Sequence, residues 1–404
     1  MSILTLTAKF QEPKYRYENE LVFAQPDNFQ EIVDIICNAA KAETSNRSLP
    51  VLFVVGPCNM GKTRTAFEAA DASINELEKL HYGKWVYVRL DMHIFAGVSN
   101  KVAEDELAHA LIRQFLGQYV NDKVYYVNLS EVLKKLNQDL GAAGVIVHID
   151  NYNLNIKLAE CLITCLANEN VRMRTGNETK CIPMVSGLPL GQLQDSSWVS
   201  RKVMLQSPNG LVDSLYTQWY LREKLELLDL LLDTCGNNPA LVLNLVNIIE
   251  SSTGMLESIK QGKFDREKAV RIWNQLIERT KPFYERRVWL DVYGSSIDDF
   301  TTSSFMDVQV DRQLDNKVEA IVGRLLNLSI SGALVNEDDL IVPELDPTLT
   351  FRNRAILFDL KGSPSSGFVV HIPLVIAFIV NDEFKVFPTK FWPELEAKLE
   401  PILG

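Results

Sequence analysis

The strongest constraint on the fold of this chain is a phosphate-binding loop signature. Residues 56–63 read Gly-Pro-Cys-Asn-Met-Gly-Lys-Thr, which matches the pattern G-x-x-x-x-G-K-T. Five apolar residues, 51–55, precede the loop, as expected of a parallel strand that is buried on both faces. A run of good helix formers, 64–70, follows it. Strand, loop and helix N-terminus together predict an anion site, because backbone N–H groups and the helix dipole both favour negative charge there.

Each part of the loop has a predicted role. Gly56 and Gly61 let the backbone turn and approach phosphate oxygens closely. Lys62 is expected to reach the β- and γ-phosphates, and the hydroxyl of Thr63 is expected to bind Mg²⁺. The predicted nucleotide contacts are Gly56, Pro57, Cys58, Asn59, Met60, Gly61, Lys62, Thr63 and Arg64.

Length and composition bound the class of protein. The 404 residues allow two or three domains, and 47% apolar residues are ordinary for a folded globular chain. No window holds 18 uninterrupted apolar residues, and the first residues lack the basic start of a secretory signal, so we expect no membrane span. The net charge of −11 argues against a surface that binds nucleic acid by charge alone. Six scattered cysteines complete no zinc site and predict reduced thiols in an intracellular protein, cytoplasmic or nuclear.

Strands alternate with helices from residue 51 onward. Apolar runs typical of strands lie at 51–55, 85–90, 144–150, 181–187 and 202–205. Helical patterns lie at 29–37, 104–119, 129–140 and 155–167. This alternation predicts an α/β fold, the P-loop NTPase fold, with a parallel sheet flanked by helices.

The pattern changes twice after the sheet. Residues 211–282 read as nearly all helix, interrupted at 235–239 by residues that suit a helix stop and a new start. A helix at 318–326 then precedes short apolar runs and a last helix. Those runs lie at 333–335, 340–342, 355–358 and 368–370, and the last helix at 392–403. The predicted organisation is an N-terminal extension (1–48), a P-loop NTPase core (49–210), a helical lid subdomain (211–282) and a small winged-helix-like α+β module (283–404).

A second part of the site is predicted at the end of the strand 144–150. Asp150 follows an apolar run, which is how P-loop proteins hold Mg²⁺ together with the loop hydroxyl. It would lie near Thr63 only if both strands are central in one sheet. A helix-capping acid is the alternative interpretation.

Asn151 stands where many hydrolysing P-loop proteins carry a glutamate. An amide can orient water but cannot accept its proton. Three interpretations stay open: turnover is slow, the base comes from elsewhere, or the site is a switch without efficient hydrolysis. Asp91, at the end of the second strand, is the nearest alternative carboxylate in topological terms.

Further candidates are polar residues in or beside the strands. Ser186 ends a strand and would position water, or would simply belong to a turn. Positive charge for the transition state would come from Arg201, from Arg64 or from an arginine of a neighbouring subunit, in which case a homo-oligomer controls activity. His148 lies inside an apolar strand and reads as a satisfied core histidine.

These motifs resemble the P-loop ATPase module of the Crinkler and retrotransposon-hot-spot (RHS) effector proteins. The resemblance is carried by residues 56–65, 147–150, 183–187 and 236–239. It implies ATP and Mg²⁺ as cofactors, a module that gates an effector, DNA or an attached nuclease as partners, and action in the nucleus of a host cell. The family usually has Asp-Glu where this chain has Asp150-Asn151, which implies weaker hydrolysis.

Three functions therefore compete. The first is a slow or regulated Mg²⁺-dependent ATPase, which makes the chain an ATP hydrolase. The second is a nucleotide-binding switch or scaffold with little turnover, and the third is a small-molecule kinase. The absence of a guanine-reading Asn/Thr-Lys-x-Asp segment favours ATP over GTP.

Overall fold

The computed structural model describes fifteen stretches of the chain. They are 23–42, 50–56, 60–92, 129–172, 179–187, 199–205, 208, 210–221, 224–293, 312–345, 347, 349–351, 358–363, 366–384 and 400–402. These residues form two compact units. The first unit contains the described residues of 28–55 and 62–204, and the second contains 23–27, 56, 60–61 and those from 205 onward.

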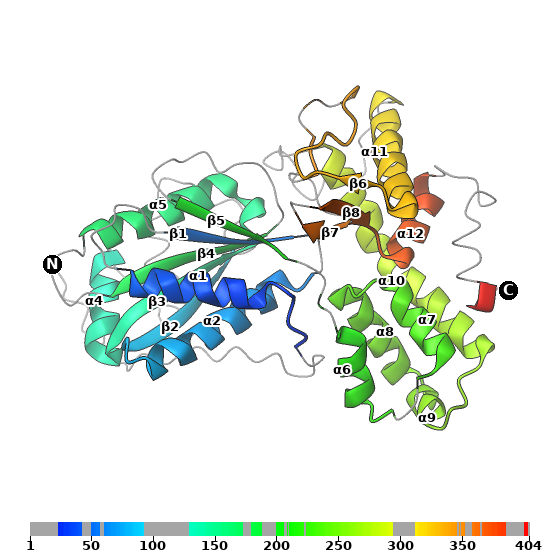
Figure 1. Cartoon of the computed structure of the whole chain (residues 1–404), viewed down its shortest axis with the longest axis horizontal. Coiled ribbons are helices and arrows are strands. Elements are labelled where there is room, and N and C mark those ends of the chain that lie inside the picture. Colours follow the sequence, from blue (N-terminus) through cyan, green and yellow to red (C-terminus); the bar gives the residue numbers. More distant parts are fainter. Residues whose placement is uncertain are drawn as a thin grey trace, which may run out of the picture. The chain divides into compact units, whose positions relative to one another are not determined.

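The first unit is built on a parallel five-stranded sheet with the order β2-β3-β4-β1-β5 (Figure 1). The strands are β1 (Pro50–Val55), β2 (Lys84–Asp91), β3 (Ala142–Asp150), β4 (Lys180–Gly187) and β5 (Val199–Met204). The three central strands are buried almost without interruption, as their apolar runs predict. The predicted parallel sheet is confirmed.

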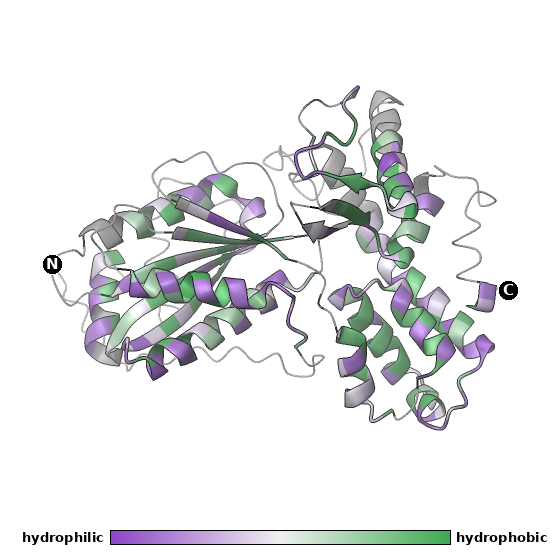
Figure 2. Ribbon diagram, viewed as in Figure 1, coloured by the Kyte–Doolittle hydropathy of each residue, from purple (hydrophilic) through white to green (hydrophobic). Residues whose placement is uncertain are grey.

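Helices cover both faces of this sheet. They are α1 (Phe29–Lys41), α2 (Lys62–Lys79), α4 (Leu129–Leu140) and α5 (Ile156–Arg172), and a short 3₁₀ turn η3 (Tyr152–Leu154) follows β3. Leu133 of α4 and Leu162 of α5 belong to the same buried cluster as alternate β3 residues such as Val147. The opposite face carries Tyr87 of β2, whose ring meets Phe67 of α2 edge-on at 5.5 Å. Hydrophobic residues accordingly follow the strands, whereas α1 and α2 each carry a hydrophobic and a hydrophilic stripe (Figure 2).

A glycine in β3 permits a close approach of β2. Gly144 pairs with Trp85, and a Cβ at this position would overlap the buried indole ring. We therefore expect Gly144→Ala to lower the free energy of unfolding by about 1–3 kcal/mol, as overpacking of a core does. Urea denaturation measures this change.

The double variant Trp85→Phe/Gly144→Ala separates ring overlap from a backbone effect. A smaller ring leaves room for the methyl group, so the two changes should cost less together than their sum. Additive losses of stability would contradict the overlap.

The second unit is mostly helical. Its helices are α6 (Leu211–Gln218), α7 (Glu226–Thr234), α8 (Pro239–Ser251), α9 (Met255–Lys260), α10 (Arg266–Tyr293), α11 (Arg312–Ser331) and α12 (Leu374–Phe384). Three antiparallel strands follow α11 in the order β6-β8-β7. They are β6 (Leu334–Val335), β7 (Asp359–Ser363) and β8 (Gly367–His371). Trp273 of α10 contacts Phe378 of α12 with ring centroids 5.7 Å apart, so the predicted lid and α+β segments lie within one unit.

The predicted break between helices at 235–239 has a clear local cause. Gly236 and Asn237 have φ values of 59° and 58°, the left-handed conformation that ends a helix. Asn238 then caps α8, because its side chain accepts hydrogen bonds from the backbone N–H groups of Ala240 and Leu241, and Pro239 is the first helical residue.

Several other predicted elements of the second half differ from the structure or lie outside the described residues. The run 340–342 forms only an isolated bridge between Leu340 and Thr350 instead of a strand. Helix α10 continues through Pro282, past the domain boundary expected there. The helix expected at 104–119, most of the one at 392–403 and the run 355–357 lie outside the described residues. None of the described helices has the length and apolar character needed to span a membrane.

Candidate nucleotide-binding site

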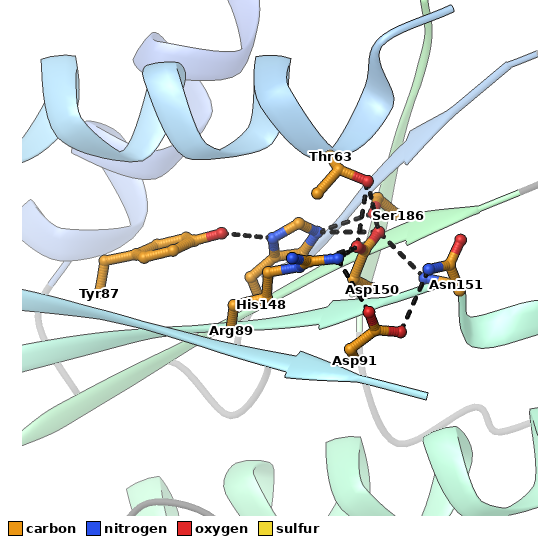
Figure 3. A network of polar contacts seen from close by, with 8 residues as sticks. All are labelled: Thr63, Tyr87, Arg89, Asp91, His148, Asp150, Asn151 and Ser186. Carbon is orange, nitrogen blue, oxygen red and sulfur yellow. Dashed lines mark hydrogen bonds and ion pairs between the residues drawn. The ribbon is translucent and has the colours of Figure 1, made fainter. Parts of the chain in front are cut away.

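Three polar residues meet at the carboxyl edge of the parallel sheet. Asp91 of β2 is the register partner of Asp150 of β3, and Asp150 is in turn the partner of Ser186 of β4. This edge is where ligands bind in open α/β sheets. Helix α2, which begins at Lys62 after the loop, brings Thr63 to the same edge (Figure 3).

Thr63 and Asp150 are in direct contact. The Thr63 hydroxyl oxygen lies 2.9 Å from Oδ1 and 3.0 Å from Oδ2 of the carboxylate, to which it donates its proton. Asp150 is only 1% exposed. The contact requires β1 and β3 to be central strands of one sheet, and they are: only β4 separates them.

Three further groups donate hydrogen bonds to Asp150. Ser186 Oγ donates to Oδ1 at 2.5 Å, and Arg89 Nε donates to Oδ2 at 2.9 Å. The backbone N–H of Asn151 donates to Oδ1 at 3.1 Å. Burial alone would raise the pKa of Asp150. The charge that His148 carries when protonated, the hydrogen bond from Ser186 and the charge of Arg89 outweigh burial and hold the pKa below its usual value. Asp150 is therefore a carboxylate at neutral pH.

Arg89 links the two acids of the site. Besides Asp150, it donates from Nη2 to Oδ2 of Asp91 at 3.0 Å. Asn151 Nδ2 donates to the other oxygen of Asp91 at 3.3 Å, from a residue whose φ of 58° is left-handed. Arg89 is not among the residues predicted for the site. Its signal was a lone charge inside an apolar strand, two residues before Asp91 and therefore on the same face.

His148 stands behind the site as a buried, neutral side chain. Burial lowers its pKa to about 4. Its Nε2 lies 2.7 Å from Ser186 Oγ, and its Nδ1 lies 2.5 Å from the hydroxyl of Tyr87. Because the Ser186 proton goes to Asp150, Nε2 must carry the hydrogen and Nδ1 must accept from Tyr87. The core-histidine interpretation fits this arrangement, but the partner of His148 is a site residue.

Two candidate arginines lie elsewhere. Arg201 is exposed and pairs with Leu52, three residues before the end of β5 at Met204, so it does not join the network at the sheet edge. Strand register places it level with Met184 of β4, two residues before Ser186, with β1 between the two strands. Its role in the site stays a prediction. Arg64 forms an ion pair with Glu68 at 3.6 Å along α2.

Part of the phosphate loop is described. Gly61 has a φ of 73°, the left-handed conformation that a glycine adopts without strain, and Met60 is buried. Within the second unit, Asn238 Nδ2 lies 3.9 Å from Met60 Sδ, and Gly56 packs closely on Leu205. Pro57, Cys58 and Asn59 lie outside the described residues.

The residues at the sheet edge fit a magnesium ion. A hydroxyl on Thr63 and a carboxylate on Asp150 are hard oxygen donors, the kind Mg²⁺ prefers. Among the described residues, no group of three or more His, Cys, Asp or Glu side chains gathers as a metal cage. Mg²⁺ is usually held by one or two carboxylates together with substrate phosphates.

The comparisons agree with this architecture. No family model and no curated protein matches the chain. Among solved structures, a Walker-type ATPase of Pyrococcus abyssi is similar with a TM-score of 0.51 and 13% identity, over 92% of this chain and 98% of that one. The ORC2 protein of Aeropyrum pernix, in ADPNP and ADP complexes, matches with a TM-score of 0.48 and 12% identity over 94% and 99% of the two chains. The Cdc6p of Pyrobaculum aerophilum matches with a TM-score of 0.41 and 11% identity over 91% and 97%.

The fold is that of a P-loop NTPase. The first of these structures, the strand order and the position of the loop before α2 agree on this point. None of these findings supports the Crinkler and RHS resemblance.

Proposed function

We propose that this protein binds ATP together with Mg²⁺ and hydrolyses it slowly or under regulation. The observation that carries the proposal is the contact between Thr63, at the start of α2, and the buried carboxylate of Asp150. These are the two groups with which P-loop proteins hold the metal of a metal–nucleotide complex. The similar structure from Pyrococcus abyssi is itself described as a Walker-type ATPase.

We expect the residues of the site to bind different parts of the metal–nucleotide complex. Backbone N–H groups of the loop and the ammonium of Lys62 would bind the phosphates. Thr63 and Asp150 would hold Mg²⁺, which neutralises phosphate charge when bound. Ser186 is fixed between His148 and Asp150, so its hydroxyl would help to orient the groups around the γ-phosphate.

A nucleotide switch with little turnover is the second candidate. It is favoured by Asn151, whose amide cannot accept a proton and already binds Asp91. Steady-state phosphate release decides between the two functions, measured with ATP and with GTP, with Mg²⁺ and with excess chelator. Release without an added acceptor also excludes a kinase that transfers phosphate only to a small molecule.

Lys62→Ala is expected to weaken ATP binding more than about tenfold, because it removes a charge-assisted contact to the phosphates. Titration of a fluorescent ATP analogue measures this affinity. Lys79→Ala, at the other end of α2, is the matched control. Undiminished affinity in Lys62→Ala would contradict the assignment of the loop.

The predicted partners can be tested in the same assay. The family resemblance suggested DNA or an attached nuclease as partners, and the need for positive charge in the transition state suggested an arginine from a neighbouring subunit. Stimulation of phosphate release by duplex DNA would support a DNA-regulated ATPase that gates an effector. A rate per molecule that rises with protein concentration would support a homo-oligomer.

A further inference from the structure

The proposed hydrolysis needs a group that takes a proton from the attacking water. Asn151 cannot do so, since an amide is not a base at neutral pH. In the described part of the chain, the network at the sheet edge contains two carboxylates, Asp91 and Asp150, and one imidazole, His148 (Figure 3).

Asp150 and His148 are unsuited to this role. The oxygens of Asp150 accept hydrogen bonds from Thr63, Ser186, Arg89 and the Asn151 backbone, and the residue is 1% exposed. His148 is fully buried, and both of its ring nitrogens are engaged by Ser186 and Tyr87. Both side chains are closed off from solvent.

Asp91 has the properties that the other two lack. Its side chain is 27% exposed, so water reaches it. It ends β2 directly beside Asp150 in the register, one strand spacing of about 4.8 Å away. Arg89 donates to one of its oxygens and Asn151 to the other, which fixes the plane of the carboxylate. Asn151 therefore orients the carboxylate of Asp91 and is not itself the base.

We propose that Asp91 is the general base of this site, held in place by Asn151 and Arg89. The carboxylate accepts a proton from water while the water oxygen forms a bond to the γ-phosphorus. The bond between the γ-phosphorus and the bridging oxygen breaks, and its electron pair stays on the β-phosphate of ADP. The proton then leaves Asp91 for solvent or for the released phosphate. This inference rests on the proposed ATP hydrolysis.

The competing explanation is that Asp91 only neutralises Arg89. Asp91→Asn discriminates between the two, because it keeps the shape of the side chain and removes the basic oxygen. A general base contributes about 10²–10⁴-fold to a rate, so phosphate release should fall at least about 100-fold. Affinity for the fluorescent ATP analogue and the melting temperature should stay close to those of the wild type.

A second variant makes the test sharper. Asp91→Asn/Asn151→Glu removes the carboxylate from β2 and supplies one at the position after Asp150. This double variant should release phosphate at least about tenfold faster than Asp91→Asn, since a base is restored at the same edge of the sheet. Asp71→Asn, on the exposed side of α2, is the matched control for the first substitution.

Each outcome decides something. Loss of turnover with retained binding, and its recovery in the double variant, supports Asp91 as the base. Wild-type turnover in Asp91→Asn overturns the assignment of Asp91 as the base and leaves the proposed function intact. Loss of ATP binding in Asp91→Asn has the same two consequences. A wild-type protein that binds ATP without releasing phosphate also overturns it. A wild-type protein that binds no nucleotide removes the proposed function itself.

Discussion

Asp150→Asn is expected to lower the rate of ATP hydrolysis on the order of 10³-fold, the largest effect of any single substitution in the site. The carboxylate is the only acid that contacts Thr63 among the described residues, and an amide cannot replace its charge beside a divalent cation. Binding of ATP should also lose most of its dependence on Mg²⁺. Phosphate release at saturating ATP and binding titrations across a range of Mg²⁺ concentrations measure both quantities.

Two controls make the result interpretable. Asp71→Asn removes one negative charge from the surface of the same unit and should leave both quantities unchanged. Circular dichroism of Asp150→Asn tests folding, because Arg89 loses one of its two carboxylate partners in this variant. A folded Asp150→Asn variant whose turnover and Mg²⁺ dependence match those of the wild type would refute the metal assignment.

The sheet and the central pair of the site could be predicted because their signals are local. An apolar run before a glycine loop identifies β1, and an apolar run before an acid identifies β3. Parallel strands place their carboxyl ends at one edge, so Thr63 and Asp150 follow from the motif once both strands are central.

Arg89 and Arg201 show what local signals leave out. The role of Arg89 depends on β2 lying next to β3, and strand order is set by packing of the whole sheet. Arg201 was chosen because it precedes a strand-like run, but β5 begins at Val199, so the residue lies in the middle of the strand. One or two residues at a strand boundary decide whether a side chain reaches the edge of the sheet.

Helix α10 illustrates a different limit. A change of composition near residue 282 suggested a boundary, and proline usually interrupts a helix. Pro282 removes the hydrogen bond to the carbonyl of Glu278, which lies on the exposed side of α10, so water can satisfy that oxygen. The buried side of the helix, with Trp273 and Tyr284, continues the same core on either side of the proline.

Arg89→Met is expected to lower the free energy of unfolding by about 2 kcal/mol at pH 7, as loss of hydrogen bonds to a charged group does. Methionine fills a similar volume but leaves the buried carboxylate of Asp150 without its cation. Arg271→Met is the matched control, because it removes an exposed ion pair with Glu267 along α10 and should cost only about 0.3–0.5 kcal/mol.

The stability lost in Arg89→Met should depend on pH, and the direction follows from the pKa of Asp150. The pKa of Asp150 is lowered in the folded protein, in part by Arg89, so its ionisation stabilises the fold above the unfolded pKa of about 3.9. That contribution is lost as the pH falls through the folded pKa, where the carboxylate is protonated in both states. The stability difference between wild type and Arg89→Met should therefore be largest at neutral pH and should shrink below about pH 4. Urea denaturation at a series of pH values measures it. A difference that stays constant down to pH 3 would mean that Arg89 acts through packing and would contradict the electrostatic link between Arg89 and Asp150.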